Sequence, residues 1–295
     1  MSPNFSTAGP TCLLDRQARF ILHSSGASYW GAVHQAPLIC RLPILTVATC
    51  VACIVIFFAN DEHGWSYGRS NEGPWWSCLA AMISHVDQEH LWSNVAFLAI
   101  AGCFLEITEG VPHVACVLFG GGCIGAALHG VADPDTRVRG TSGAIYAVFF
   151  SQLSLLALNW AEMPARVLRL CVLLILIVVD VAALIFWRSD NVSYEGHLFG
   201  ALAGVSIALV LGRNVRLRRF EIAFTWLGVL GYAALVATAF AGGQTKAAAL
   251  AAGVLPLLGV AATWITRCSL RAPDPVPSPT VPEGDCDRGG FVVRM

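Results

Sequence analysis

The sequence predicts an all-α protein that crosses a membrane several times. Of its 295 residues, 56% are hydrophobic and only 13% are charged, whereas a soluble domain carries about 25% charged residues. Apolar stretches of about 20 residues recur along the chain, and this length crosses ~30 Å of hydrocarbon as an α-helix. We expect eight spans, at residues 42–59, 90–106, 112–132, 142–158, 167–187, 197–212, 222–241 and 247–267.

Polar segments divide the chain into four regions. Residues 1–41 mix charged, polar and proline residues and lack the basic-then-apolar start of a secretory signal, so we expect a retained cytoplasmic segment. Residues 42–212 hold six spans, which we take as the core. Residues 213–269 open with an arginine cluster and add two transmembrane helices in which we find no chemistry. Residues 270–295 are rich in proline and poor in apolar residues, which predicts a disordered cytoplasmic tail.

Basic residues set the expected orientation. Cytoplasmic segments of membrane proteins carry an excess of Lys and Arg. If the N-terminus is cytoplasmic, then 13 of the 18 basic residues fall on the cytoplasmic side, and the opposite side carries only Arg69, Arg137, Arg139, Arg188 and Lys246. We therefore expect both termini in the cytoplasm.

Composition argues against several functional classes. The net charge is −1 and no basic cluster alternates with aromatic residues, so nucleic acid is not an expected partner. Most of the 11 cysteines lie in apolar runs, where free cysteine behaves as a small hydrophobic residue. The pair Cys50 and Cys53 has no second pair at zinc-site spacing, so we expect no metal and no other cofactor.

A serine and a histidine each begin an apolar run. Gly140-Thr-Ser142-Gly143 opens the fourth span, and His197 opens the sixth. Serine is a poor nucleophile without a base within hydrogen-bond reach, and histidine can be that base. At a helix N-terminus, Ser142 also faces unpaired N–H groups and the positive end of the helix dipole. The alternative is that Ser142 only caps its helix.

Small residues predict that these two helices lie in close contact. Gly196, Gly200 and Gly204 recur every four residues in the sixth span, and Gly143 and Ala147 do so in the fourth. This small-xxx-small pattern lets helix backbones approach each other in a membrane. The alternative is that the glycines serve packing alone and that His197 is an interfacial histidine.

Polar residues also mark the second span. His90 and Asn94 are four residues apart and share one helical face, where both can donate hydrogen bonds. His85 and His90 are five apart, about 140° around one ideal helix, which argues against a metal pair. Ordinary hydrogen bonding between helices remains an alternative for His90 and Asn94.

These motifs together resemble the rhomboid intramembrane serine proteases. That family combines His-x4-His-x3-Asn, here from His85 to Asn94, with Gly-x-Ser-Gly and with a later histidine followed by small residues. The three blocks occur in order and cover about residues 42–212. One departure is Trp75-Trp76, where the family usually has Trp-Arg in its first loop.

The resemblance implies roles for individual residues. It implies that Ser142 and His197 form a catalytic dyad and that His90 and Asn94 line the oxyanion hole. Tyr146 would then pack on the ring of the catalytic histidine. Supporting roles fall to His85, Gly140, Gly143 and Gly200, and Glu106 is interpreted as a structural anchor.

The expected function is cleavage of single-span membrane protein substrates within or at the edge of the lipid bilayer. The site would open to the non-cytoplasmic side, and the oligomeric state stays open. Two alternatives are a catalytically silent rhomboid-like protein that binds membrane clients and, less favoured, a transporter. Asp180, in the apolar part of the fifth span, either accepts a hydrogen bond from His197 or has a purely structural place.

Overall fold

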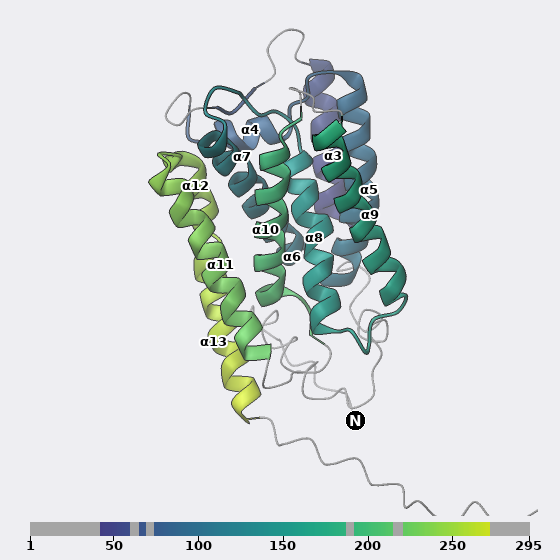
Figure 1. Cartoon of the computed structure of the whole chain (residues 1–295), viewed down its shortest axis with the longest axis vertical. Helices are drawn as coiled ribbons and strands as arrows, with labels where there is room; N and C mark the ends of the chain where they lie inside the picture. Colours follow the sequence, from purple (N-terminus) through teal and green to yellow (C-terminus); the bar gives the residue numbers. More distant parts are fainter. Residues whose placement is uncertain (1–41, 60–64, 69–73, 187–191, 215–220, 272–295) are drawn as a thin grey trace, which may run out of the picture.

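The computed structural model describes residues 42–59, 65–68, 74–186, 192–214 and 221–271. The predicted segment 1–41 and nearly all of the predicted tail 270–295 lie outside the described residues. Within that part of the chain, every regular element is a helix, and the one isolated β-bridge pairs Tyr67 with Val138. The helices run roughly side by side as a bundle (Figure 1). The predicted all-α class is confirmed.

Helices occupy all eight predicted spans. They are α3 (Ile44–Ala59), α5 (Gln88–Glu109), α6 (Val111–Ala115) with η2 (Cys116–Gly120) and α7 (Gly121–Ala132), α8 (Ser142–Leu158), α9 (Arg166–Phe186), α10 (Tyr194–Leu211), α11 (Glu221–Ala241), and α12 (Thr245–Ala252) with α13 (Leu255–Arg271).

Three details were not predicted. A short helix, α4 (Ser77–Met82), lies in the loop before α5. The third span contains the π-helical segment η2. The eighth span is divided at Gly253 and Val254. Pro256 then occupies the first turn of α13, where its missing N–H costs no helical hydrogen bond.

The surface of the bundle is suited to lipid. Six of the described helical segments are long and apolar enough to cross a membrane. On α9 the one buried residue is Leu173, and apolar side chains such as Val178 and Phe186 are exposed along its length. The chain is therefore an integral, multi-pass membrane protein. Its orientation, and the membrane placement of the last two spans, stay predictions.

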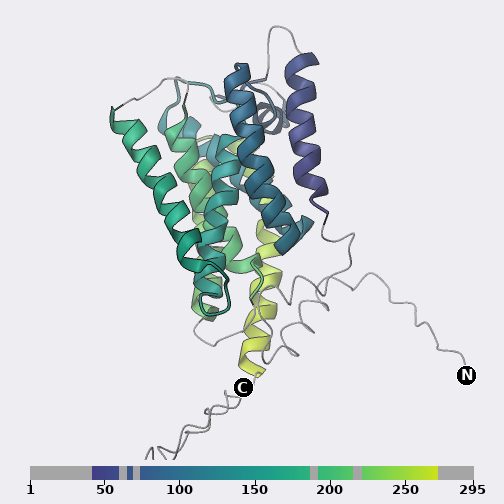
Figure 2. The same ribbon diagram turned by 90° about the vertical axis from the view of Figure 1, so that its right-hand side faces the viewer.

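Helices α8 and α10 form the centre of the bundle, flanked by α9 and α5 on one side and by α11 on the other (Figures 1 and 2). A Cβ atom added to Gly200 would lie 2.2 Å from the carbonyl oxygen of Gly143, and one added to Gly204 would lie 2.1 Å from that of Ala147. Both distances are far below van der Waals contact, so only glycine fits. The predicted close approach of these two helices is present.

A buried carboxylate joins α3 to α5. The side chain of Glu106 is fully buried and accepts hydrogen bonds from the backbone N–H of Leu45 at 2.9 Å and of Thr46 at 2.8 Å. It also accepts one from the Thr46 hydroxyl at 2.7 Å. Because the first N–H groups of a helix lack intrahelical partners, Glu106 satisfies the start of α3. This geometry agrees with its interpretation as a structural anchor.

The C-terminal helices pack onto the core rather than standing apart. Tyr232 of α11 is fully buried, and its hydroxyl donates to the carbonyl oxygen of Ala251 at 3.1 Å. Gln244, in the turn between α11 and α12, is 1% exposed and accepts a hydrogen bond from the Tyr67 hydroxyl at 2.8 Å. Its side chain lies against Gly130, where a Cβ atom would be 2.6 Å from the Gln244 amide nitrogen.

Candidate active site

Ser142 is the first residue of α8, and the N-terminus of this helix is left uncapped. The N-cap residue, Thr141, makes no side-chain capping bond. Its hydroxyl instead donates to the carbonyl oxygen of Met82 at 2.6 Å. The N–H groups of the first turn of α8 therefore have no capping acceptor, and an uncapped helix N-terminus attracts negative charge. The alternative that Ser142 caps α8 does not fit this geometry, because Ser142 lies inside the helix.

His197 lies in the first turn of α10 and is 8% exposed. The helix begins at Tyr194, slightly earlier than predicted, because the Ser193 hydroxyl accepts a hydrogen bond from the N–H of Gly196 at 3.1 Å. The ring of Tyr146 is stacked on that of His197, with centroids 4.0 Å apart and an interplanar angle of 10°. This is the arrangement that the resemblance implied for Tyr146.

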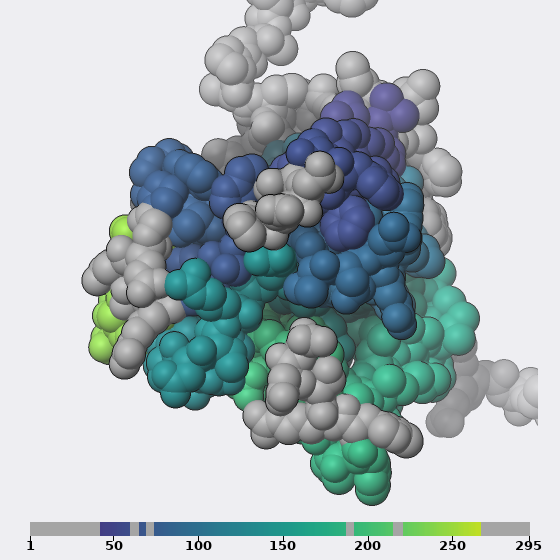
Figure 3. Space-filling model, turned by 90° about the horizontal axis from the view of Figure 1, so that it is seen from above, coloured from purple at the N-terminus to yellow at the C-terminus, as the bar shows by residue number. Residues whose placement is uncertain are grey.

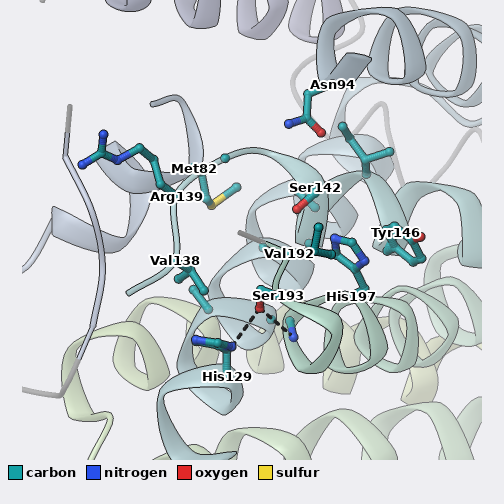
Figure 4. A pocket seen from close by; sticks show the side chains of 18 of the residues that line it. Met82, Asn94, His129, Val138, Arg139, Ser142, Tyr146, Val192, Ser193 and His197 are labelled. Carbon is teal, nitrogen blue, oxygen red and sulfur yellow. Dashed lines mark hydrogen bonds between the residues drawn. The ribbon is translucent and has the colours of Figure 1, made fainter. Parts of the chain in front are cut away.

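Within the described part of the chain, no hydrogen bond joins Ser142 to His197. Figure 4 shows the side chain of Ser142 between those of Asn94 and His197. In unliganded enzymes, catalytic hydrogen bonds are often long and tighten only when substrate binds. The observed arrangement is therefore compatible with a serine and its base.

His90 and Asn94 meet the loop that precedes Ser142 at Gly140. Gly140 has a φ of +118°, a conformation that favours glycine. A Cβ atom there would lie 2.6 Å from Cε1 of His90 and 3.5 Å from Nδ2 of Asn94. Asn94 is 6% exposed, and its Nδ2 has no hydrogen-bond partner among the described residues. A buried amide donor without an acceptor needs an explanation, and an oxyanion is one.

His85 lies outside the helix that carries His90, so our argument from helical faces was wrong for this pair. Helix α5 begins at Gln88, where Asp87 accepts a hydrogen bond from the N–H of His90 at 2.7 Å. The rings of His85 and His90 are in edge contact, with centroids 5.2 Å apart. Burial, and to a lesser degree the neighbouring His90, lower the pKa of His85 to about 4. A neutral His85 packed under His90 is consistent with the predicted supporting role.

One cavity of about 660 Å³ brings the candidate residues together. Seen from the end where α8 and α10 begin, the teal residues of 133–141 lie between the blue and the green parts of the molecule (Figure 3). Of the residues predicted for the site, only His85 and Gly200 do not line the cavity; those that do are His90, Asn94, Gly140, Ser142, Gly143, Tyr146 and His197.

Comparison with known families finds one domain that includes these residues. Residues 72–214 match the rhomboid domain. The chain carries a rhomboid domain. The matched region runs from just before α4 to just beyond the end of α10, so that α3 and α11–α13 lie outside it.

Several curated rhomboid-related proteins are similar to the chain. It is 27% identical over 194 residues to Rhomboid-related protein 1 of Caenorhabditis elegans, covering 64% of this chain and 54% of that protein. It is 28% identical over 171 residues to Rhomboid-related protein 3 of Homo sapiens, covering 55% and 42%. A third relative, Inactive rhomboid-related protein 2 of Caenorhabditis elegans, is 26% identical over 186 residues, covering 55% and 53%. The chain spans about half the length of the curated relatives it matches.

The rhomboid domain also contains a polar cluster that the sequence did not reveal. His129 of α7 hydrogen-bonds through Nδ1 to the Ser193 hydroxyl at 2.8 Å (Figure 4). Its Nε2 hydrogen-bonds to the Thr136 hydroxyl, also at 2.8 Å. Glu195 lies 3.7 Å from Nδ1 of His129. All four residues line the cavity. A helix start at Ser193 could have been found from its N-cap chemistry, but no sequence signal paired it with a histidine 64 residues earlier.

Proposed function

We propose that the protein is an intramembrane serine endopeptidase that cleaves single-span membrane protein substrates. The observation that carries this proposal is the uncapped start of α8 at Ser142, in one cavity with His197 and with the unpartnered amide of Asn94. A nucleophile, a base and hydrogen-bond donors are the groups that acyl transfer requires. Because the site lies in a membrane bundle, the substrate would be a peptide segment within or at the edge of the bilayer.

The proposed reaction uses this chain's own residues and needs no cofactor. His197 takes the proton from the Ser142 hydroxyl while the Ser142 oxygen attacks the substrate carbonyl. The negative charge on the carbonyl oxygen is held by the N–H of Ser142, by Asn94 Nδ2 and by His90. His197 then gives its proton to the leaving amine as the peptide bond breaks. Water from the non-cytoplasmic side, activated by the same histidine, releases the acyl group from Ser142.

A catalytically silent client-binding protein is the second candidate. One matched relative is named an inactive rhomboid-related protein, and no hydrogen bond between Ser142 and His197 is present in the described residues. The presence of both residues in one cavity favours the protease. A transporter would need ionisable residues in interrupted spans of paired halves, whereas the stretch of α9 from 170 to 186 is unbroken and contains one charged residue, Asp180.

Labelling with a fluorophosphonate separates the protease from both alternatives. This probe forms a covalent bond with a serine only where a base activates it, so the purified full chain should be labelled. The Ser142→Ala and His197→Ala variants should not be labelled. Ser206→Ala is a matched control, because Ser206 is a half-buried serine of α10 outside the cavity, and its hydroxyl donates to the carbonyl oxygen of Leu202 at 2.8 Å. A wild-type chain that stays unlabelled refutes the proposed function.

Asn94→Ala should slow cleavage without destabilising the fold. Removal of one oxyanion donor typically lowers turnover by about 10²-fold to 10³-fold. The Nδ2 of Asn94 has no partner to leave unpaired, so the variant should unfold thermally at or near the wild-type temperature. The measurements are kcat on a reconstituted substrate and a melting curve in detergent. Unchanged kcat would assign Asn94 to helix packing.

A further inference from the structure

Helix α9 carries a single acidic residue, Asp180, in its apolar part. Between residues 170 and 186 every residue except Asp180 is uncharged, and the helix exposes most of its apolar side chains. A carboxylate among membrane-spanning residues is costly, and it is found where a partner compensates or a function requires it. The partners of Asp180 therefore decide its role.

Both partners of Asp180 belong to the candidate active site. Its Oδ1 accepts a hydrogen bond from the Tyr146 hydroxyl at 2.8 Å and lies 3.4 Å from Nδ1 of His197. Tyr146 is in turn stacked face to face on the His197 ring. One carboxylate oxygen from α9 thus meets a phenol from α8 and an imidazole from α10.

This contact involves Nδ1 of His197, which leaves Nε2 as the nitrogen available to take the proton of Ser142. The hydrogen bond made by one imidazole nitrogen decides where the proton sits on the ring. A carboxylate can only accept, so Asp180 would keep the proton on Nδ1 and leave Nε2 with its lone pair. It would also stabilise the imidazolium that forms when His197 takes the serine proton.

We propose that Asp180 is a positioning residue for His197, acting together with Tyr146, so that the catalytic pair of this chain is a triad. The role rests on the proposed function. Asp180 accepts no proton during the reaction: it fixes the tautomer and the orientation of the histidine ring, and Tyr146 holds the carboxylate oxygen and the face of that ring. A purely structural Asp180 would instead only tie α9 to α8 through the Tyr146 hydroxyl.

Four variants of the full chain test this role. Asp180→Asn is nearly isosteric, but its amide can donate to Nδ1 and so favour the wrong tautomer. It should lower both kcat and the rate of fluorophosphonate labelling about tenfold to a hundredfold, the range expected for loss of a charge-assisted hydrogen bond, with KM nearly unchanged. Asp180→Glu should lose less activity than Asp180→Asn, because it keeps the carboxylate.

Tyr146→Phe should lower kcat less than Asp180→Asn does, because the contact between Asp180 and His197 remains. Cys171→Ser, at an exposed position on the same helix, is the control and should behave as wild type.

A spectroscopic measurement gives a readout that does not depend on turnover. With ¹⁵N-labelled histidine, the His197 signals are identified by their absence in His197→Ala. The wild type should show a protonated Nδ1 and an unprotonated Nε2 when the ring is neutral, and Asp180→Asn should move the ring away from this tautomer.

The outcomes are separable. Wild-type kcat and labelling in Asp180→Asn, or the same tautomer in both proteins, overturns the positioning role while the protease proposal stands. A loss in Asp180→Asn that a hydrophobic Asp180→Leu does not share also overturns it, because catalysis would then not need the carboxylate. A wild-type chain that is neither labelled nor active refutes the protease proposal, and the positioning role with it.

Discussion

Alanine at Ser142 or at His197 is expected to abolish cleavage of a single-span substrate reconstituted with the protein. Each change removes one half of a unit that acts together, so the rate should fall by about 10⁴-fold or more. For the same reason, the double variant should be no slower than either single variant. The measurement is the rate of appearance of the cleaved fragment in proteoliposomes.

Ser206→Ala, on the same helix as His197, is the control for insertion and should cleave at the wild-type rate. Normal cleavage in either single variant of the pair would show that another nucleophile or base carries the reaction. Losses that multiply in the double variant would show that Ser142 and His197 act independently.

Gly200→Ala is expected to disable the site by separating two helices. A Cβ atom at this position would lie 2.2 Å from the carbonyl oxygen of Gly143, the residue next to Ser142. The backbones must move apart, which costs about 1–3 kcal/mol in a packed core. A displacement of about 1 Å at reacting groups can lower the rate about 10²-fold. We therefore expect at least that loss of cleavage and a lower thermal unfolding temperature.

Gly259→Ala is the matched control for this change. A Cβ atom at Gly259 of α13 would meet no heavy atom within 4 Å, so this variant should keep both the stability and the activity of the wild type. If Gly200→Ala cleaves as fast as Gly259→Ala, the contact between α8 and α10 does not set the geometry of the site.

The sequence predicted the features that depend on local chemistry and on length. Apolar runs long enough to cross a membrane predicted the position of each long helix in the described part of the chain, and α8 begins at Ser142 as expected. The glycines at positions 200 and 204 predicted the close helix contact because only a residue without Cβ permits it. The stacking of Tyr146 on His197 was predicted from the resemblance to a family and not from residue spacing.

The features that were missed depend on tertiary contacts or on overlooked caps. The contact between His85 and His90 was not predicted, because we treated both as residues of one helix. Asp87 is a typical N-cap residue and could have marked the start of α5. The sequence placed Asp180 in the apolar part of the fifth span. It could not show toward which neighbour the carboxylate turns, because that depends on how α9 is rotated against α8 and α10.

The hydrogen bond between Tyr67 and Gln244 has a consequence for the order in which the molecule is completed. Its two residues are 177 positions apart in the chain. At a synthesis rate of roughly 5–20 residues per second, Tyr67 is made roughly 10–35 s before its partner exists. In the finished fold the backbone of Tyr67 also pairs with that of Val138, which belongs to the loop before Ser142 and lines the cavity. The Tyr67 segment, which pairs with the loop beside the candidate active site, therefore reaches its final set of contacts only after the turn between α11 and α12 has been made.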